Sequence, residues 1–326
     1  MKAVQIKKTG SPEVLEYVDV ERPSPGKGQV LVKLESISIN YADVMMRGGF
    51  YPAIPPLPAI LGLEGSGVVD SLGDGVTHVK SGQSVVVTGT VGCYAEYVVA
   101  ESNVVIPIPD SLDKDFAAAF PVNYLTAYHM MNTMGHIKPG QSIIVHAAAG
   151  GVGTSIIQLA KIAGIRTIGL TSSSEKIQFA KEQGADHVIN YKTEDVSQRV
   201  KELTDGKGVE LILNSVAGDT FSRDFDMLAP LGQVIWYGFA AGMPTVNLTE
   251  VIGSHFMKSK GLRAFVIYDI FDIPELMNES SKLMIQYLQE GKIKPVIHER
   301  IPLAEAARAH QLLESQAVKG KLILKP

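Results

Sequence analysis

The segment from Ser142 to Ala163 constrains the fold of this chain more than any other stretch of the sequence. A short apolar run leads into a turn that contains Gly150, Gly151 and Gly153, and apolar residues at helical spacing follow. Glycines let a backbone turn tightly and approach a pyrophosphate, while the first turn of a helix offers free N–H groups to anions. This order therefore predicts the phosphate-binding opening of a dinucleotide-binding fold, although Ala148 stands where the pattern usually begins with glycine.

The residues after this segment alternate between strand and helix patterns. We predict strands at 166–171, 187–190, 209–213, 233–237 and 261–267, with helices between them at 172–183, 194–204 and 219–228. Ser172 and Glu175 predict a capping box at the start of the first of these helices, and Gly184 predicts its end. Strands that alternate with helices at this spacing pair in parallel through right-handed crossovers. The fold class expected is α/β, with a doubly wound parallel sheet.

Length and composition exclude several classes of protein. A chain of 326 residues is long enough for two domains with ample cores. Its net charge of −4 gives no basic surface, so we expect no nucleic-acid partner. No stretch reaches the roughly 18 uncharged apolar residues of a membrane helix, and the N-terminus has no apolar signal core. The single cysteine, Cys93, excludes an internal disulfide and a cysteine-based zinc cage. A cytoplasmic location fits all of this.

The two ends of the chain predict a different pattern of secondary structure from the middle. Residues 1–123 read as short β-runs separated by turns rich in glycine and proline. The tail contains two helix patterns, at 273–289 and 303–314, and a closing strand at 321–324. That strand needs a sheet to join, and the N-terminal domain supplies the expected one. The nucleotide-binding domain, residues 124–264, is therefore predicted to be inserted in a discontinuous β-rich domain formed by 1–123 and 265–326.

Over its whole length the sequence resembles the medium-chain dehydrogenases/reductases, and within them the zinc-free, zeta-crystallin-like quinone oxidoreductases. The matching segments are MKAVQI, GQVLVKLESISINYADVMMRGGFY, LGLEGSGVVDSLGDGV, AAAGGVG, INYK and KGKLIL. The resemblance implies a Rossmann-type NADPH-binding domain inserted in a GroES-like substrate domain. It also implies a homodimer formed through the edge of the nucleotide-domain sheet, around 246–265.

Zinc-dependent relatives place a Cys, then a His-Glu pair, then further ligands around a catalytic metal. Here the first ligand region, Ser38–Asp43, has no Cys, and Leu63-Glu64 replaces the His-Glu pair. A catalytic zinc site needs about three protein ligands, which Glu64 alone cannot supply. Without a Lewis acid, the acceptor has to spread negative charge over its own π-system, as a quinone or an enone does. We therefore expect no metal and a small-molecule quinone or enone substrate.

The end of the second strand of the nucleotide domain predicts which cofactor binds. NAD-binding folds carry an acid about 20 residues past the glycines, but this chain has Ser172, Ser173 and Lys176 there. Lysine and hydroxyl groups suit the 2′-phosphate of NADPH, and Tyr191 matches a tyrosine that borders this phosphate in the family. The alternative is a solvated Lys176 and a packing Tyr191. Relatives often have an arginine nearby, where this chain has Gln316.

Further contacts of the cofactor follow from the resemblance and from the carboxyl ends of the predicted strands. His146, just before the glycine-rich turn, is interpreted as a packing residue at a strand end. The remaining residues predicted to bind the cofactor are Tyr41, Thr126, Ala149, Gly150, Gly151, Val152, Gly153, Asn214, Ser215, Tyr237, Gly238, Phe239, Phe265 and Val266.

Three residues near the first helix pattern are candidates for the chemistry. Asn40 is placed as a donor to the substrate or nicotinamide carbonyl, and Asp43 is balanced between a helix cap and a site residue. Tyr51 matches a tyrosine assigned as proton donor in the related enoyl thioester reductases. An enone reaction needs such a donor, whereas a hydroquinone dianion collects protons from water. The alternative for Tyr51 is an aromatic residue that only shapes the pocket.

Three functions are compatible with these residues. The favoured function is zinc-independent, NADPH-dependent reduction of quinones or related conjugated carbonyls. One alternative is an enoyl thioester reductase, of the 2-enoyl-CoA type, with Tyr51 as proton donor. The other is an NADPH-binding, crystallin-like structural protein.

Overall fold

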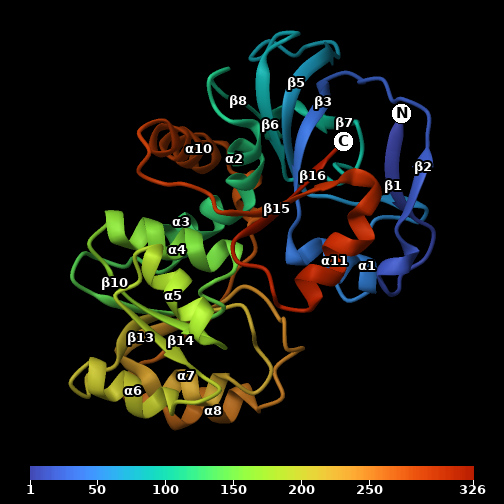
Figure 1. The fold of residues 1–326 in the computed structure, drawn as a ribbon. Helices are drawn as coiled ribbons and strands as arrows, with labels where there is room; N and C mark the ends of the chain where they lie inside the picture. Colours follow the sequence, from blue (N-terminus) through green and yellow to red (C-terminus); the bar gives the residue numbers. More distant parts are fainter. The chain divides into compact units, whose positions relative to one another are not determined.

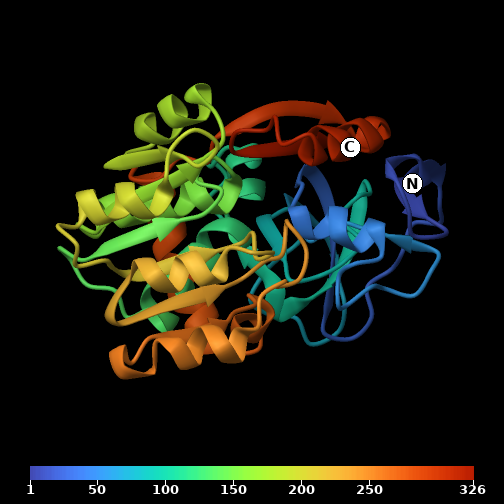
Figure 2. The same ribbon diagram turned by 90° about the horizontal axis from the view of Figure 1, so that it is seen from below.

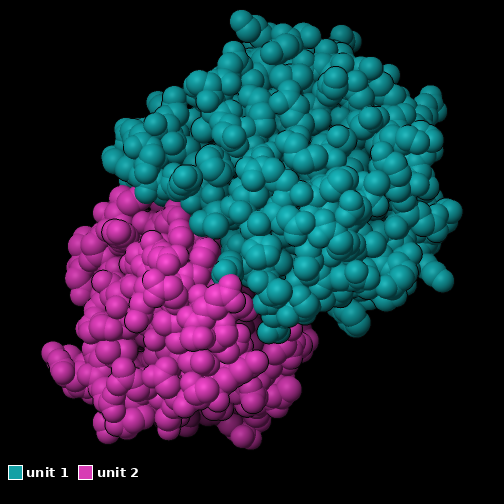
Figure 3. Space-filling view, viewed as in Figure 1, with its two compact units in different colours: residues 1–125, 268–326 teal, residues 126–267 magenta.

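The computed structural model describes residues 1–326, and the chain divides into two compact units (Figure 3). Unit 1 consists of residues 1–125 and 268–326, and unit 2 of residues 126–267. The first boundary lies where a π-helical turn, Pro121–Leu125, passes into helix α3, Thr126–His129. Both boundaries lie a few residues beyond those drawn from the sequence. None of the helices has the length and hydropathy that crossing a membrane requires.

Unit 2 contains a six-stranded sheet in the order β11-β10-β9-β12-β13-β14, and every pair in it is parallel. From β9 the chain builds outward to β10 and β11, then returns to place β12 on the other side of β9. This confirms the predicted doubly wound sheet and puts its topological switch point between β9 and β12. The strands are β9 (Ser142–Val145), β10 (Arg166–Thr171), β11 (His187–Asn190), β12 (Val209–Asn214), β13 (Leu228–Trp236) and β14 (Gly261–Ala264).

One helix precedes these strands, and the others connect them. They are α3, α4 (Gly151–Ile162), α5 (Ser174–Glu182), α6 (Val196–Leu203), α7 (Phe221–Met227) and α8 (Leu248–Ser254) (Figure 1). Ile144, Ile168 and Ile212, from three neighbouring strands, are fully buried in one cluster with Phe221 and Phe225 of α7. Burial of a parallel sheet between helices explains why its strands read as continuous apolar runs in the sequence.

The start of α5 corrects one prediction. Ser173, not Ser172, is the N-cap residue, because its backbone stays extended and its side chain accepts a hydrogen bond from the backbone N–H of Lys176. The capping box drawn from Ser172 and Glu175 was therefore wrong by one residue. Glu175 still lies in the first turn, where its negative charge suits the helix dipole.

Unit 1 contains a seven-stranded sheet, with order β15-β16-β3-β5-β6-β8 and β7 beside β3, and a three-stranded sheet, β2-β1-β4. The C-terminal strand β16 is antiparallel to β3, which confirms that the closing strand joins the sheet of the N-terminal half. Figure 1 and Figure 2 show this red strand beside the blue one. The strands are β1 (Lys2–Ile6), β2 (Glu16–Asp19), β3 (Gln29–Ser38), β4 (Ala59–Ile60), β5 (Glu64–Leu72), β6 (Ser84–Thr88), β7 (Tyr97–Glu101), β8 (Val105–Pro107), β15 (Ile297–Pro302) and β16 (Lys321–Lys325).

Five helices complete unit 1. They are α1 (Tyr41–Gly48), α2 (Lys114–Ala119), α9 (Tyr268–Phe271), α10 (Pro274–Gln289) and α11 (Ala306–Glu314). The predicted helix at 303–314 is shorter than expected, because Leu303–Glu305 forms a separate 3₁₀ turn.

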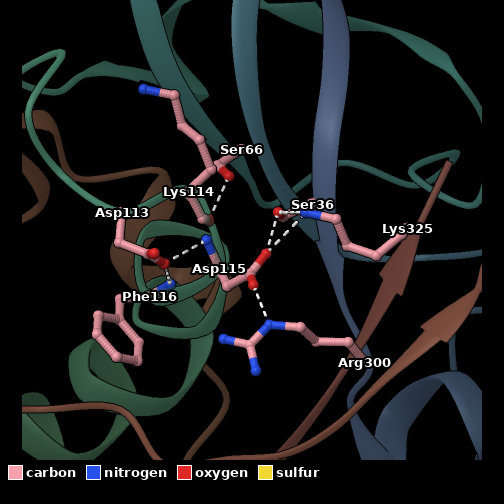
Figure 4. A network of polar contacts seen from close by, with 8 residues as sticks. All are labelled: Ser36, Ser66, Asp113, Lys114, Asp115, Phe116, Arg300 and Lys325. Atoms are coloured by element: carbon pink, nitrogen blue, oxygen red, sulfur yellow. Dashed lines mark hydrogen bonds and ion pairs between the residues drawn. The ribbon is translucent and has the colours of Figure 1, made fainter.

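Asp115 links the two chain segments of unit 1 (Figure 4). Its carboxylate accepts hydrogen bonds from Ser36 of β3 and Arg300 of β15, and from Lys325 Nζ of β16 at 2.9 Å. Burial would raise the pKa of Asp115, but the hydrogen bonds from Ser36, Lys325 and Arg300 outweigh it and lower this pKa. The charged form therefore holds the N-terminal and C-terminal strands together.

Candidate functional site

The glycine-rich turn of unit 2 leaves no room for side chains at its third glycine. Helix α4 begins directly after its N-cap, Gly150, and a Cβ atom on Gly153 would lie 2.4 Å from the carbonyl oxygen of Ala147. Ala147 itself adopts a left-handed backbone, with φ of 49°. The first N–H groups of α4 have no helical acceptor, so this close-packed turn offers them to an anion.

Ala148, which stands in place of the first glycine, has a matching gap in the neighbouring strand. Gly169 of β10 is its neighbour, and a Cβ atom there would lie 2.8 Å from the Ala148 methyl carbon. The methyl group thus occupies the volume that Gly169 leaves open. The departure from the usual glycine pattern is therefore accommodated, and the turn keeps a shape that suits a pyrophosphate.

Two buried hydroxyl groups near this turn lack partners. They are Thr154 Oγ1, in the first turn of α4, and Thr171 Oγ1, at the end of β10. A buried polar group without a hydrogen bond costs about 1–3 kcal/mol. Both oxygens are fully buried, so the glycine-rich turn, and not these hydroxyls, is the feature of this edge that fits the pyrophosphate of a dinucleotide.

The ends of β10 and β11 bring together the residues predicted to recognise the 2′-phosphate. Thr171 pairs with Asn190, and the N–H of Tyr191 donates to the Thr171 carbonyl at 3.0 Å. Burial, and then the nearby charge of Lys192, lower the pKa of Lys176. Sequence reasoning missed Lys192, although the residue after Tyr191 necessarily lies at the same strand end. Two neighbouring ammonium groups favour an anion between them.

At the ends of β12 and β13, the side chain of Asn214 is used within unit 2. It donates to Asp224 at 2.7 Å and to Thr220 at 2.8 Å, while its oxygen accepts the N–H groups of the next loop. Tyr237 follows β13, its N–H bonded to the Asn214 carbonyl, and burial raises the pKa of Tyr237 to about 12. Phe265 follows β14, with its N–H bonded to the Trp236 carbonyl.

In unit 1, Asp43 is a structural residue of α1 and also a buried acid. One carboxylate oxygen, Oδ2, accepts the backbone N–H of Asn40 at 2.8 Å, while Oδ1 is buried without a hydrogen-bond partner. Burial raises the pKa of Asp43 to about 7, against the opposing effects of the Asn40 N–H and Lys321. The sequence left two roles open for Asp43, a helix cap and a site residue. Its hydrogen bond with the Asn40 N–H is the one expected of a helix cap.

Asn40, Glu64 and Lys321 form a buried polar cluster. Lys321 Nζ lies 2.7 Å from Asn40 Oδ1 and 3.1 Å from Glu64 Oε1, and Asn40 Nδ2 donates to the same Glu64 oxygen at 2.9 Å. The other Glu64 oxygen accepts the N–H of Val122 at 2.8 Å. Glu64 is thus paired with an ammonium group, and no three His, Cys, Asp or Glu side chains are grouped to hold a metal ion. The second N–H of the Asn40 amide has no partner within this cluster.

Tyr51 has a phenolic neighbour that the sequence did not indicate. Burial raises the pKa of Tyr51, and a hydrogen bond with Tyr268 of α9 opposes that rise. The same contact adds to the effect of burial in raising the pKa of Tyr268. This contact therefore acts in opposite directions on the pKa values of the two phenols. The loop here also exposes apolar surface, because Phe50 is 77% exposed. Tyr268 lies in the tail, outside every motif.

Two family models match the chain. The model of the alcohol dehydrogenase GroES-like domain matches residues 26–110, in unit 1. The model of the zinc-binding dehydrogenases matches residues 151–282, which begin at α4.

Proteins similar to this chain match it nearly end to end. A quinone oxidoreductase of Pseudomonas aeruginosa is 37% identical over 100% of this chain and 99% of its own length. The human synaptic vesicle membrane protein VAT-1 homolog is 32% identical over 93% of this chain and 80% of its own length. The crystal structure of Escherichia coli quinone oxidoreductase complexed with NADPH is 35% identical, covers 100% of both chains and has a TM-score of 0.95.

Proposed function

Because this chain belongs to the quinone oxidoreductase family of the medium-chain dehydrogenases/reductases, we propose that it reduces quinones or related conjugated carbonyl compounds without a metal ion. Membership makes it an NADPH-dependent oxidoreductase. The observation that carries the proposal is the contact of Lys321 Nζ with Glu64 Oε1 at 3.1 Å. An ammonium group neutralises the acid at the position of the zinc relatives' His-Glu pair.

The absence of metal ligands determines which acceptors are suitable. With Glu64 paired to Lys321, no cluster of side chains supplies a Lewis acid to polarise a simple ketone. A quinone or enone instead places the charge of the incoming hydride on a conjugated oxygen. The remaining N–H of Asn40 is a donor of the kind that such an oxygen requires.

NADPH supplies the hydride, and we assign its binding to unit 2. The turn at 150–153 and the N-terminus of α4 would hold the pyrophosphate. Lys176, Lys192 and Tyr191, from two adjacent strand ends, would hold the 2′-phosphate. Lys192 adds positive charge on a chain that has Gln316 in place of the arginine seen in relatives.

A second candidate function is the reduction of enoyl thioesters, and the phenol pair of Tyr51 and Tyr268 favours it. The contact with Tyr268 acts to lower the pKa of Tyr51, which would ease the transfer of the Tyr51 proton to an enolate carbon. A quinone reaction does not need this donor, because a hydroquinone anion takes protons from water.

Activity with two acceptors separates these functions. NADPH oxidation is measured with 9,10-phenanthrenequinone and with crotonyl-CoA, for wild type and Tyr51→Phe. We expect Tyr51→Phe to leave quinone turnover within about threefold, because the hydroquinone anion takes its protons from water. A threefold change corresponds to less than about 1 kcal/mol in the activation free energy. Thioester turnover that Tyr51→Phe abolishes would favour the enoyl reductase. NADPH binding without turnover of either acceptor would favour a structural, crystallin-like protein.

We also propose a homodimer formed through the edge of the unit 2 sheet. Strand β14 is an edge strand, and Phe256 and Met257 just before it are 78% and 92% exposed. Exposed edges and apolar side chains of this kind favour pairing with another copy. Light scattering on the purified protein is expected to give twice the 35.1 kDa mass of one chain.

A further inference from the structure

The two strands that flank the switch point of unit 2 are joined by side chains at their carboxyl ends. His146 directly follows β9, its N–H donates to the Leu213 carbonyl of β12 at 3.1 Å, and Asn214 is the last residue of β12. In open α/β sheets, ligands bind outside these carboxyl ends, at the switch point. His146 and Asn214 are therefore on the edge of the sheet where a dinucleotide binds.

Asp224 of α7 is a buried residue that contacts the side chains of both His146 and Asn214. The side chain of Asp224 is fully buried, and its Oδ1 lies 3.0 Å from Nε2 of His146. Its Oδ2 accepts the hydrogen bond from Asn214 Nδ2 at 2.7 Å. A carboxylate can only accept, so Nε2 of the imidazole carries the proton. Asp224 thereby fixes both the ring orientation and the tautomer of His146.

The other ring nitrogen, Nδ1, is then left with a free lone pair. Nδ1 forms no hydrogen bond within unit 2, where Nε2 is the ring nitrogen that contacts Asp224. It differs from Thr171 Oγ1, which is fully buried without a partner. His146 is 3% exposed, and a ligand at this edge of the sheet would reach Nδ1 through that small exposed part.

We infer that His146 is a cofactor-binding residue whose Nδ1 accepts a hydrogen bond from a ribose hydroxyl of the dinucleotide, with Asp224 as its positioning residue. The inference rests on NADPH binding by unit 2. The glycine-rich turn, which begins just after His146, would hold the pyrophosphate. Phosphates at neutral pH have few protons to donate, and the group attached directly to them is a ribose, whose hydroxyls can donate to Nδ1.

The tautomer and its response to cofactor are measurable in the unaltered protein. Full-length protein labelled with ¹⁵N-histidine is titrated with NADP⁺, and His146→Gln identifies the resonances of His146. We expect a protonated Nε2 throughout, and an Nδ1 resonance of the unprotonated type that moves upfield when NADP⁺ saturates the site. An Nδ1 resonance that is unchanged at saturation overturns the inference, whether or not any variant folds.

Asp224→Asn tests the positioning role. An amide offers one acceptor and one donor in place of two acceptors, so one of its two contacts must reverse. We expect His146 to change tautomer and the Kd for NADPH to rise about tenfold, in a protein that still unfolds cooperatively. Unchanged affinity with a changed tautomer would overturn the inference. A wild type that fails to bind NADPH would instead refute the proposed function.

The chain offers a matched control two residues along the same helix. Asp226 also contacts a histidine, with its Oδ1 3.2 Å from Nε2 of His255, but its side chain is 69% exposed. Asp226→Asn removes the same charge from the same helix without touching His146. NADPH affinity and the His146 spectrum are expected to stay at wild-type values. A Kd that rises as much as in Asp224→Asn would assign the effect to the charge of α7 and contradict the inference.

Discussion

At the scale of single residues, Asp43 combines a hydrogen bond at the start of α1 with complete burial of its side chain. The spacing of Asn40 and Asp43 indicated a helix start, and the backbone N–H of one does bond to the carboxylate of the other. Nothing local predicted that Asp43 would be fully buried, because that burial arises from the packing of unit 1 around α1. Tyr268 was missed for the same reason, since its importance depends on Tyr51, which is distant in sequence, whereas Lys192 was overlooked beside the predicted Tyr191.

The raised pKa of Asp43 predicts a pH dependence of stability. Its pKa is about 7 in the folded protein and about 3.9 in the unfolded chain. The folded state thus binds the extra proton between these values, and this residue's contribution to stability falls as pH rises from about 4 to about 7. Relative to wild type, Asp43→Asn should therefore gain stability over that interval. Urea unfolding at several pH values measures this difference, and a constant difference would contradict it.

The lysines at the ends of β10 and β11 predict cofactor preference. Lys176→Ala should weaken NADPH binding roughly ten- to hundredfold, or about 1.4–2.8 kcal/mol, and hardly affect NADH. Lys192→Ala should change the same preference in the same direction, because its ammonium group lies near that of Lys176 and would itself attract the 2′-phosphate. Fluorescence titration with both cofactors measures the two constants. Equal losses for NADPH and NADH would contradict the assignment.

At the scale of elements, local signals predicted most strands and missed how they are tied together. The alternation of apolar runs and turns predicted β10, β11 and β16 at nearly their observed bounds. The start of α5 was placed one residue early, because two serines compete for the N-cap and only backbone geometry selects Ser173. The contacts of Asp115 could not be predicted, since they join β3 to strands near the end of the chain.

Removal of the Asp115 carboxylate should loosen unit 1. Asp115→Ala is expected to lower the free energy of unfolding by about 1.5–3 kcal/mol at pH 7, the range for hydrogen bonds to a charged group. Since its folded pKa is lowered, the stabilisation is present above the unfolded pKa, about 3.9, and is lost as pH falls below it. Urea unfolding tests this, with the exposed Asp110→Ala as control. Equal effects of the two substitutions would contradict the role of Asp115.

At the scale of the whole molecule, the fold followed from the sequence more completely than the site. The doubly wound sheet and the return of β16 to the N-terminal sheet were both predicted, because periodicity and chain order determine them. The cluster of Asn40, Glu64 and Lys321 was not, because its members come from three distant segments. The sequence indicated which zinc ligands were missing, but not that a lysine would pair with the glutamate that remained.

Because Lys321 pairs with Glu64, we expect turnover that does not depend on a metal ion. The protein is stripped with a chelator, its metal content is measured by mass spectrometry, and NADPH oxidation by 9,10-phenanthrenequinone is then followed with and without added Zn²⁺. We expect full activity at well under one metal ion per chain, with no gain from zinc. Activity that disappears on stripping and returns with Zn²⁺ would contradict it.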